Sequence, residues 1–252
     1  MTVEQTSSTV NSIQKNKIEE QNIVQPDSIN TYRNQNWNPD KGQYYFSEEF
    51  TFRYSNAWED TQGISSGNFG FYLDPETGTV LLEKNITHFF DEMTNYIIIK
   101  PNGNYILGYD DEFGKLRTIQ KNVFKTDGVS ENLKNVQEDF ERFFKSKQET
   151  AEFGTNQYYA KALIAEKYER TYVKSPDKVQ VYIAPINIPT TALYLVETVF
   201  EELDMPVKWD YGYSLPNNHL VVKEIFKTKE GTSVGFELKS IMATEYHIQL
   251  PD

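Results

Sequence analysis

Residues 43–54 read QYYFSEEFTFRY, and this stretch decides the fold class. Apolar side chains recur there at alternate positions: Tyr44, Phe46, Phe50, Phe52 and Tyr54. Period-2 alternation is typical of a β-strand with one buried face and one face in water, which antiparallel sheets allow. Only Glu48 interrupts the apolar face. We therefore predict that a β-rich domain begins at about Gln43 with a long strand.

The sequence that follows contains several segments with the residues typical of turns. The segment Asp74-Pro75-Glu76-Thr77-Gly78 predicts a hairpin turn closed by a left-handed glycine, and 101–103 and 110–114 predict two more turns. Residues 96–99 are apolar at consecutive positions, so we expect a central strand covered on both faces. Later strands are predicted over residues 179–183, 207–213, 219–226, 233–241 and 244–250.

Helical periodicity marks a block around residues 130–203. Its three segments are residues 130–146, 157–169 and 190–203. In the first, Leu133, Val136 and Phe140 are spaced as the apolar stripe of a helix. The β-branched residues of the last segment leave a strand open there. The predicted fold class is α+β, with a curved, mostly antiparallel sheet of roughly eight to ten strands and two or three helices packed on one face.

Aromatic residues divide the chain into a tail and a domain. All of them except Tyr32 and Trp37 lie beyond residue 40. Residues 1–40 are rich in Gln, Asn, Ser, Thr and Glu, and their apolar residues follow neither period. Such a segment buries too little apolar surface to offset its ordering entropy. We predict a flexible polar tail over 1–40 and a single β-rich domain over 41–252.

Charge and composition exclude several classes of function. The net charge is −12, the same sign as phosphate backbones and anionic membranes, so no nucleic-acid partner is expected. The acidity serves solubility, or forms an acidic face for a basic partner protein. The chain has no cysteine, which excludes disulfides, thiolate zinc sites and cysteine nucleophiles. No apolar run approaches the length of a transmembrane helix.

No motif in the chain predicts catalysis or a cofactor. His88, His219 and His247 lack metal-ligand spacing, and the contiguous acids at 110–112 fit a solvated turn better than a calcium loop. Phosphate-cradling and nucleophile-elbow patterns are also missing from the sequence. We therefore expect a protein that is not an enzyme and uses no cofactor or metal.

Aromatic side chains suggest a ligand site instead. Trp209, Tyr211 and Tyr213 share one face of a predicted strand, and Trp58 closely follows the first strand. Such rows bind ligands in a cleft, or are simply core and cross-strand pairs. Glu48 either rests at a sheet edge or lines a cavity, where its pKa would be raised. The candidate ligand-binding residues are Glu48, Phe52, Trp58, Trp209, Tyr211 and Tyr213.

The order of elements resembles a known family. A long first strand, a meander, intervening helices and closing strands, with the endings Met205-Pro206-Val207-Lys208-Trp209 and Phe236-Glu237-Leu238-Lys239-Ser240-Ile241, resemble the periplasmic lipoprotein-carrier-like half barrels. The resemblance covers about residues 43–250. It implies a curved sheet around helices with an apolar cleft for acyl chains.

Three functions remain open from the sequence. We favour a binding or carrier protein outside the bacterial cytoplasm, periplasmic or secreted, which holds a lipid or other apolar ligand between sheet and helices. The absence of cysteine suits that location, although cytoplasmic proteins can also lack it. The second is an acidic inhibitor or immunity-type module that binds a basic protein. The third is a hydrolase whose acids come together only in the fold.

Overall fold

A computed structural model describes residues 37–55, 66–87, 90–124, 144–153, 163–171, 177–205, 218–229 and 231–251. The strands in these residues are β1 (Gln43–Ser55), β2 (Ser66–Asp74), β3 (Thr79–Glu83), β4 (Thr94–Ile99), β5 (Asn104–Asp110), β6 (Leu116–Asn122), β7 (Phe144–Phe153), β8 (Leu163–Thr171), β9 (Lys178–Pro185), β10 (His219–Thr228) and β11 (Gly231–Gln249). All neighbouring strands are antiparallel.

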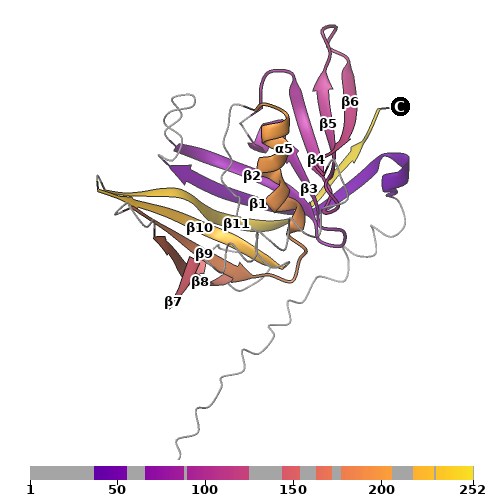
Figure 1. Ribbon diagram of the computed structural model, residues 1–252. Coiled ribbons are helices and arrows are strands. Elements are labelled where there is room, and N and C mark those ends of the chain that lie inside the picture. The colour runs from indigo at the N-terminus through magenta and orange to yellow at the C-terminus, as the bar shows by residue number, and fades with distance from the viewer. Residues whose placement is uncertain are drawn as a thin grey trace, which may run out of the picture.

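The strands form one sheet in the order β6-β5-β4-β3-β2-β1-β11-β10-β9-β8-β7. The chain therefore runs outward from the central strand β1 to β6, crosses to the far edge at β7, and returns to pair β11 with β1. The edge strands β6 and β7 are not paired with each other in the described ranges, so the curved sheet stays open there (Figure 1). All the described strands between Gln43 and Gln249 thus belong to one sheet.

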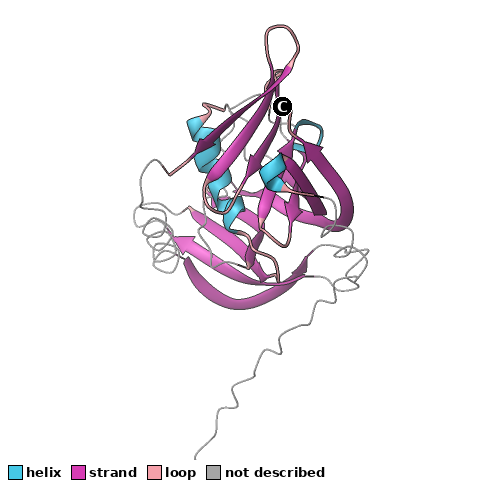
Figure 2. Cartoon of the chain, turned by 90° about the vertical axis from the view of Figure 1, so that its right-hand side faces the viewer, coloured by secondary structure: helices cyan, strands magenta, loops and turns pink. Residues whose placement is uncertain are grey.

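The helices within the described residues are short. They are η1 (Pro39–Lys41), α3 (Lys84–Thr87), η2 (Thr191–Leu195) and α5 (Val196–Glu202). The last two are continuous and confirm the helix predicted over residues 190–203, so the strand alternative for this segment is wrong. They form a helical stretch against which β3 and β4 pack. Figure 2 shows the strands curving around the helices.

The rest of the predicted helical block is corrected where it is described. Residues 163–169, predicted as a helix, lie in β8, and residues 144–146 begin β7. Residues 125–143 and 154–162 lie outside the described ranges. Ile164 and Tyr168 are spaced as on one face of a helix, but β8 has a strand on each side. The backbone N–H and C=O groups of β8 therefore pair with β7 and β9, and this pairing outweighs the local helical pattern. The sheet consequently has eleven described strands, more than we predicted.

Two apolar clusters cover the two faces of the sheet around β3 and β4. Val80, Leu82, Ile97 and Ile99 belong to the larger cluster, which also includes the helical stretch; Leu81 and Ile98 belong to the smaller one. This confirms that residues 96–99 form a central strand covered on both sides. It also places the helical stretch of η2 and α5 on the face of the larger cluster, the concave one (Figure 1).

The first strand is more deeply buried than its alternation predicted. Tyr44 and Phe46 join the smaller cluster, whereas Phe50 and Phe52 join the larger one. The pairing of β1 with β11 is irregular between Phe46 and Glu48, where the strand changes cluster. Tyr45 and Ser47, predicted to face water, are buried as well. The simple one-wet-face interpretation fails because other residues of the chain pack on both faces of β1.

The structure confirms several other local predictions and corrects one of them. Gly78 has φ +70°, as a left-handed turn glycine requires. The strands predicted over 179–183, 219–226 and 233–241 are present in β9, β10 and β11. The separate strand predicted over 244–250 is wrong, because β11 continues without interruption to Gln249. The predicted strand at 207–213 lies outside the described residues.

Candidate functional site

Five phenylalanines form a stacked row on the concave face at the centre of the sheet. We call this row the aromatic floor, and its members are Phe50, Phe52, Phe69, Phe71 and Phe236. Phe50 lies opposite Phe71 and Phe52 opposite Phe69 in the β1–β2 register. Their ring centroids are 4.9 Å and 5.1 Å apart, with planes 14° and 5° from parallel.

The fifth ring completes the floor from the other side of β1. Phe236 of β11 meets the Phe52 ring edge-on, with centroids 5.8 Å apart and planes at 79°. Stacked and edge-on pairs are the favoured geometries of aromatic rings, and each contributes about 0.5–1.5 kcal/mol beyond burial. Cross-strand pairing therefore fixes the five rings as one continuous apolar surface.

The helical stretch adds a second wall to the same cluster. Leu193, Val196, Val199 and Phe200 are buried and belong with the aromatic floor to the larger apolar cluster. Phe200 also meets Phe90 edge-on, with centroids 6.3 Å apart. The Tyr194 hydroxyl donates a hydrogen bond to the His219 carbonyl at the start of β10. The helical stretch is thus attached to the sheet by apolar packing, by this hydrogen bond and by an ion pair of 3.7 Å between Glu202 of α5 and Lys121 of β6.

Two carboxylates lie among these apolar residues. Glu48 and Glu224 are each only 3% exposed, and each interacts with other groups of the chain. Glu48 lies opposite Leu73, and Glu224 lies opposite Phe236. Directly opposed residues of an antiparallel pair share a face of the sheet. Both acids therefore border the concave face.

Glu48 is not at a sheet edge, since β1 has a strand on each side. This removes one of the two interpretations of its place on the apolar face. Glu224 was missed by the sequence analysis, although a similar signal was present. Leu220, Val222 and Phe226 alternate along β10, and Glu224 interrupts their pattern as Glu48 interrupts the first strand.

The two buried acids are too far apart to act as an acid/base pair. Glu48 lies opposite Ala243 and Glu224 opposite Phe236, so they are separated by seven positions along β11. That spacing corresponds to about 20 Å along a strand, whereas paired catalytic carboxylates lie roughly 5–10 Å apart. Within the described part of the chain there is also no group of three or more acids or histidines that could hold a metal ion.

Of the six predicted ligand-binding residues, two can be located. Phe52 lies in the aromatic floor and Glu48 on the same concave face of β1. Both come from the first strand, where they share the concave face four positions apart. The other four, Trp58, Trp209, Tyr211 and Tyr213, lie outside the described residues.

The acidic turn at 110–112 has a structural role. The Asp111 carboxylate accepts hydrogen bonds from the backbone N–H groups of Phe113 and Lys115 and forms an ion pair of 2.9 Å with Arg117. These contacts lower the pKa of Asp111, with the Lys115 hydrogen bond as the largest cause. The carboxylate therefore stabilises the β5–β6 turn, as expected for a solvated hairpin.

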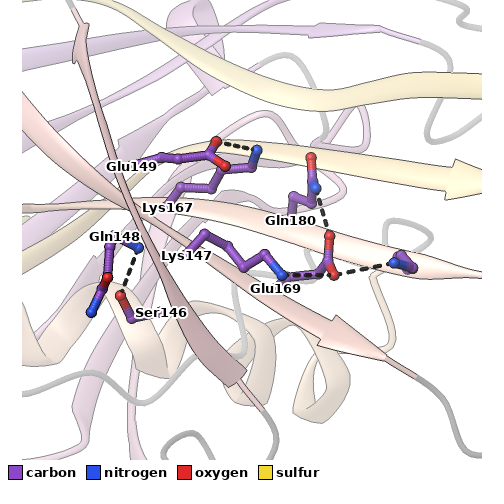
Figure 3. A network of polar contacts seen from close by, with 8 residues as sticks. Ser146, Lys147, Gln148, Glu149, Lys167, Glu169 and Gln180 are labelled. Atoms are coloured by element: carbon purple, nitrogen blue, oxygen red, sulfur yellow. Dashed lines mark hydrogen bonds and ion pairs between the residues drawn. The ribbon is translucent and has the colours of Figure 1, made fainter.

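The strands at the β7 edge carry a polar network of mixed charge. Glu169 accepts a hydrogen bond of 2.7 Å from the Gln180 amide and pairs with the ammonium groups of Lys147 and Lys178 at 3.4 Å and 3.2 Å (Figure 3). A second ion pair joins Lys167 to Glu149 at 2.6 Å. Acids here are paired with lysines, and charged edge strands of this kind discourage pairing with other chains.

No protein-family model matches the chain, and no curated protein matches it in sequence. Among the described residues, no helix is both long and apolar enough to cross a lipid bilayer. The proposed function is therefore based on the geometry of the concave face.

Proposed function

We propose that this protein is a non-enzymatic binding or carrier protein that holds an apolar ligand between the concave face of the sheet and its helices. The observation that carries the proposal is the aromatic floor, which lies inside a curved sheet whose edge strands β6 and β7 are not paired with each other in the described ranges. A closed barrel fixes the width of its interior, whereas an open sheet can widen by movement of its two halves. The floor and the helical stretch then supply two apolar walls.

Burial of apolar surface would supply the affinity. Each methylene group removed from water contributes about 0.8 kcal/mol, so an acyl chain with about twelve buried methylenes gains roughly 10 kcal/mol before the costs of binding. Those costs include displacing contacts that the floor makes in the unbound protein, where its rings are almost fully buried. The ligand must therefore replace protein contacts as the helical stretch moves away from the floor.

The chemistry of the concave face favours an uncharged ligand. Within the described residues, its buried carboxyl groups are those of Glu48 and Glu224, and no lysine or arginine is buried there. A free fatty acid would bring a third carboxylate toward them, and like charges repel strongly where the dielectric constant is low. We propose an uncharged or cationic head group on an acyl chain as the ligand class.

The expected cellular location follows the same proposal. The resemblance to periplasmic lipoprotein-carrier-like half barrels implies a sheet that wraps around helices and holds acyl chains, and the chain lacks cysteine. We propose that the protein works outside the bacterial cytoplasm, where lipids must be shielded from water in transit.

The rival proposal, an acidic module for a basic partner, receives less support. Such a module needs a contiguous acidic patch. In the network of Figure 3, Glu149 and Glu169 are each matched by lysines instead. This face is therefore not a surface for steering toward a basic protein.

Native mass spectrometry tests the proposal. Protein purified from its bacterial host is measured directly and after extraction with organic solvent. A carrier shows an adduct of lipid mass that extraction removes and that returns when an uncharged monoacylglycerol is added. A single apo mass before and after addition would overturn the proposal. Binding of a basic protein in place of lipid would support the rival.

A further inference from the structure

A hollow lies outside the apolar cluster of the concave face. It encloses about 300 Å³, at the lower end of the range for small-molecule sites. Three segments meet there: residues 37–45 at the start of β1, the β2–β3 turn at 74–79 and the β4–β5 turn at 100–102. None of its lining residues belongs to the larger apolar cluster, so it is separate from the proposed lipid site.

Aromatic rings form one side of this hollow. Trp37 lies over the cross-strand pair Tyr45 and His247, with ring centroids 6.3 Å and 4.6 Å away. Tyr44 adds a third lining ring, and the Lys100 ammonium lies 5.2 Å from its centroid. Residues 37–40, which we assigned to the tail, thus belong to the folded part and supply one wall.

The two turns contribute a rim of polar groups to the hollow. Asp74 accepts hydrogen bonds from the Glu76 backbone N–H, at 3.0 Å, and from the Thr77 hydroxyl. The hydroxyls of Thr77 and Thr79 are 2.8 Å apart. In the β4–β5 turn, the Asn102 side chain accepts a hydrogen bond of 3.1 Å from the backbone of Asn104. These contacts hold the polar groups in place before any ligand arrives.

The charges around the hollow nearly cancel. Among the described residues, Asp74 and Lys100 are the charged residues that line it, and the Asp74 carboxylate accepts hydrogen bonds within its own turn. The other polar lining groups are uncharged hydroxyls and amides, from Gln43, Thr77, Thr79 and Asn102. A strongly charged ligand would therefore meet no cluster of opposite charge, and an apolar chain would leave these polar groups unpaired.

We infer that this hollow binds an uncharged polyhydroxylated ligand, a sugar ring of a glycan. The C–H face of a sugar ring is apolar and weakly positive, so it packs against the negative face of an aromatic ring. The hydroxyl groups around the ring would exchange hydrogen bonds with the rim. An aromatic wall and a fixed, nearly neutral polar rim are the two features that such a ligand requires.

The test is an NMR titration of the full-length protein labelled with ¹⁵N. The probes are chitotetraose, maltohexaose and cellohexaose at about 1–10 mM, the range of weak sites, with inorganic phosphate as an anionic probe. We expect at least one saccharide to shift the signals of the Trp37 indole N–H and the Asn102 amide. Asn102→Ala and Trp37→Ala should each weaken binding about tenfold or more. Phe113→Ala, which removes an exposed aromatic ring from the β5–β6 turn, should leave binding unchanged.

Several results would overturn the inference. These are no shift with any of the saccharides, equal binding by wild-type protein and the folded Asn102→Ala variant, or shifts with phosphate alone that disappear in Lys100→Ala. The wild-type titration and the Asn102 variant decide the matter even if Trp37→Ala does not fold. Lipid binding by the concave face is measured separately, so failure of either proposal leaves the other standing.

Discussion

Phe52 and Phe69 stack across the β1–β2 pair with their ring centroids 5.1 Å apart and their planes 5° from parallel. Both side chains are almost fully buried. Phe52→Ala should lower the free energy of unfolding by about 3–5 kcal/mol, since it removes the ring and leaves a cavity. Denaturant unfolding checks this value. Phe113→Ala, at a site 84% exposed, is the control and should change stability by less than about 0.5 kcal/mol.

Tyr194→Phe should loosen the helical stretch without unfolding the sheet. It removes the hydroxyl that donates to the His219 carbonyl, at an expected cost of about 1 kcal/mol. Hydrogen exchange of the α5 amides should become faster, and a bound lipid should dissociate faster. Tyr109→Phe is the control, because the described residues show no hydrogen bond from its hydroxyl. Equal exchange rates in the two variants would show that this contact does not hold the helix.

Gly70→Ala should destabilise β2 more than Gly67→Ala does. A methyl group at Gly70 would lie 2.7 Å from the Phe50 carbonyl oxygen, and this backbone atom cannot move without disturbing β1. At Gly67 the new methyl would meet the end of the Tyr54 side chain, which can turn aside. Overpacking of this kind costs about 1–3 kcal/mol. Thermal unfolding of both variants measures the difference, and a less stable Gly67→Ala would contradict the packing of β1 on β2.

Glu169 should make the fold sensitive to acid. The hydrogen bond from Gln180, followed by those from Lys178 and Lys147, lowers the pKa of its carboxyl from 4.5 to about 2. A lowered pKa stabilises the folded state at neutral pH, and this contribution is lost as the pH falls from about 5 to about 2. The full shift corresponds to about 3 kcal/mol, but its lysine partners are exposed and screened, so we expect about 1 kcal/mol.

Unfolding of Glu169→Gln as a function of pH tests this expectation. The variant should be less stable than the wild type at pH 7, and the difference should shrink toward pH 2. Glu152→Gln, an exposed carboxylate on β7, is the matched control and should follow the wild-type profile. Parallel profiles for Glu169→Gln and wild type would show that the network of Figure 3 does not contribute to acid stability.

The sequence predicted individual strands and turns correctly where each has a characteristic local pattern of residues. The alternation of residues 43–54, the apolar run at 96–99 and the glycine at position 78 each gave the correct element. The helix at 190–203 was also correct, since its apolar residues pack on one face of the sheet. The order of the strands in the sheet could not be predicted from the sequence, because the pairing of β1 with β11 joins residues almost 200 positions apart.

The errors have a common physical cause. In β8, Lys167 and Glu169 form ion pairs with residues of the neighbouring strands. The sequence of residues 163–171 alone gives no indication of these partners. Likewise, Tyr45 is buried because Trp37 covers it from a segment we assigned to the tail. The candidate site was predictable only in part, since Phe52 and Glu48 follow from the first strand while Glu224 required knowing that β10 joins the concave face.

Contact between a ligand and the aromatic floor tests the central claim most directly. The measurement is an isotope-filtered NMR experiment on delipidated protein with a ¹³C-labelled, uncharged monoacylglycerol. The account predicts nuclear Overhauser effects between acyl methylene protons and the rings of Phe52, Phe69 and Phe236. Effects confined to exposed residues such as Phe113, or no effects at saturating ligand, would contradict it.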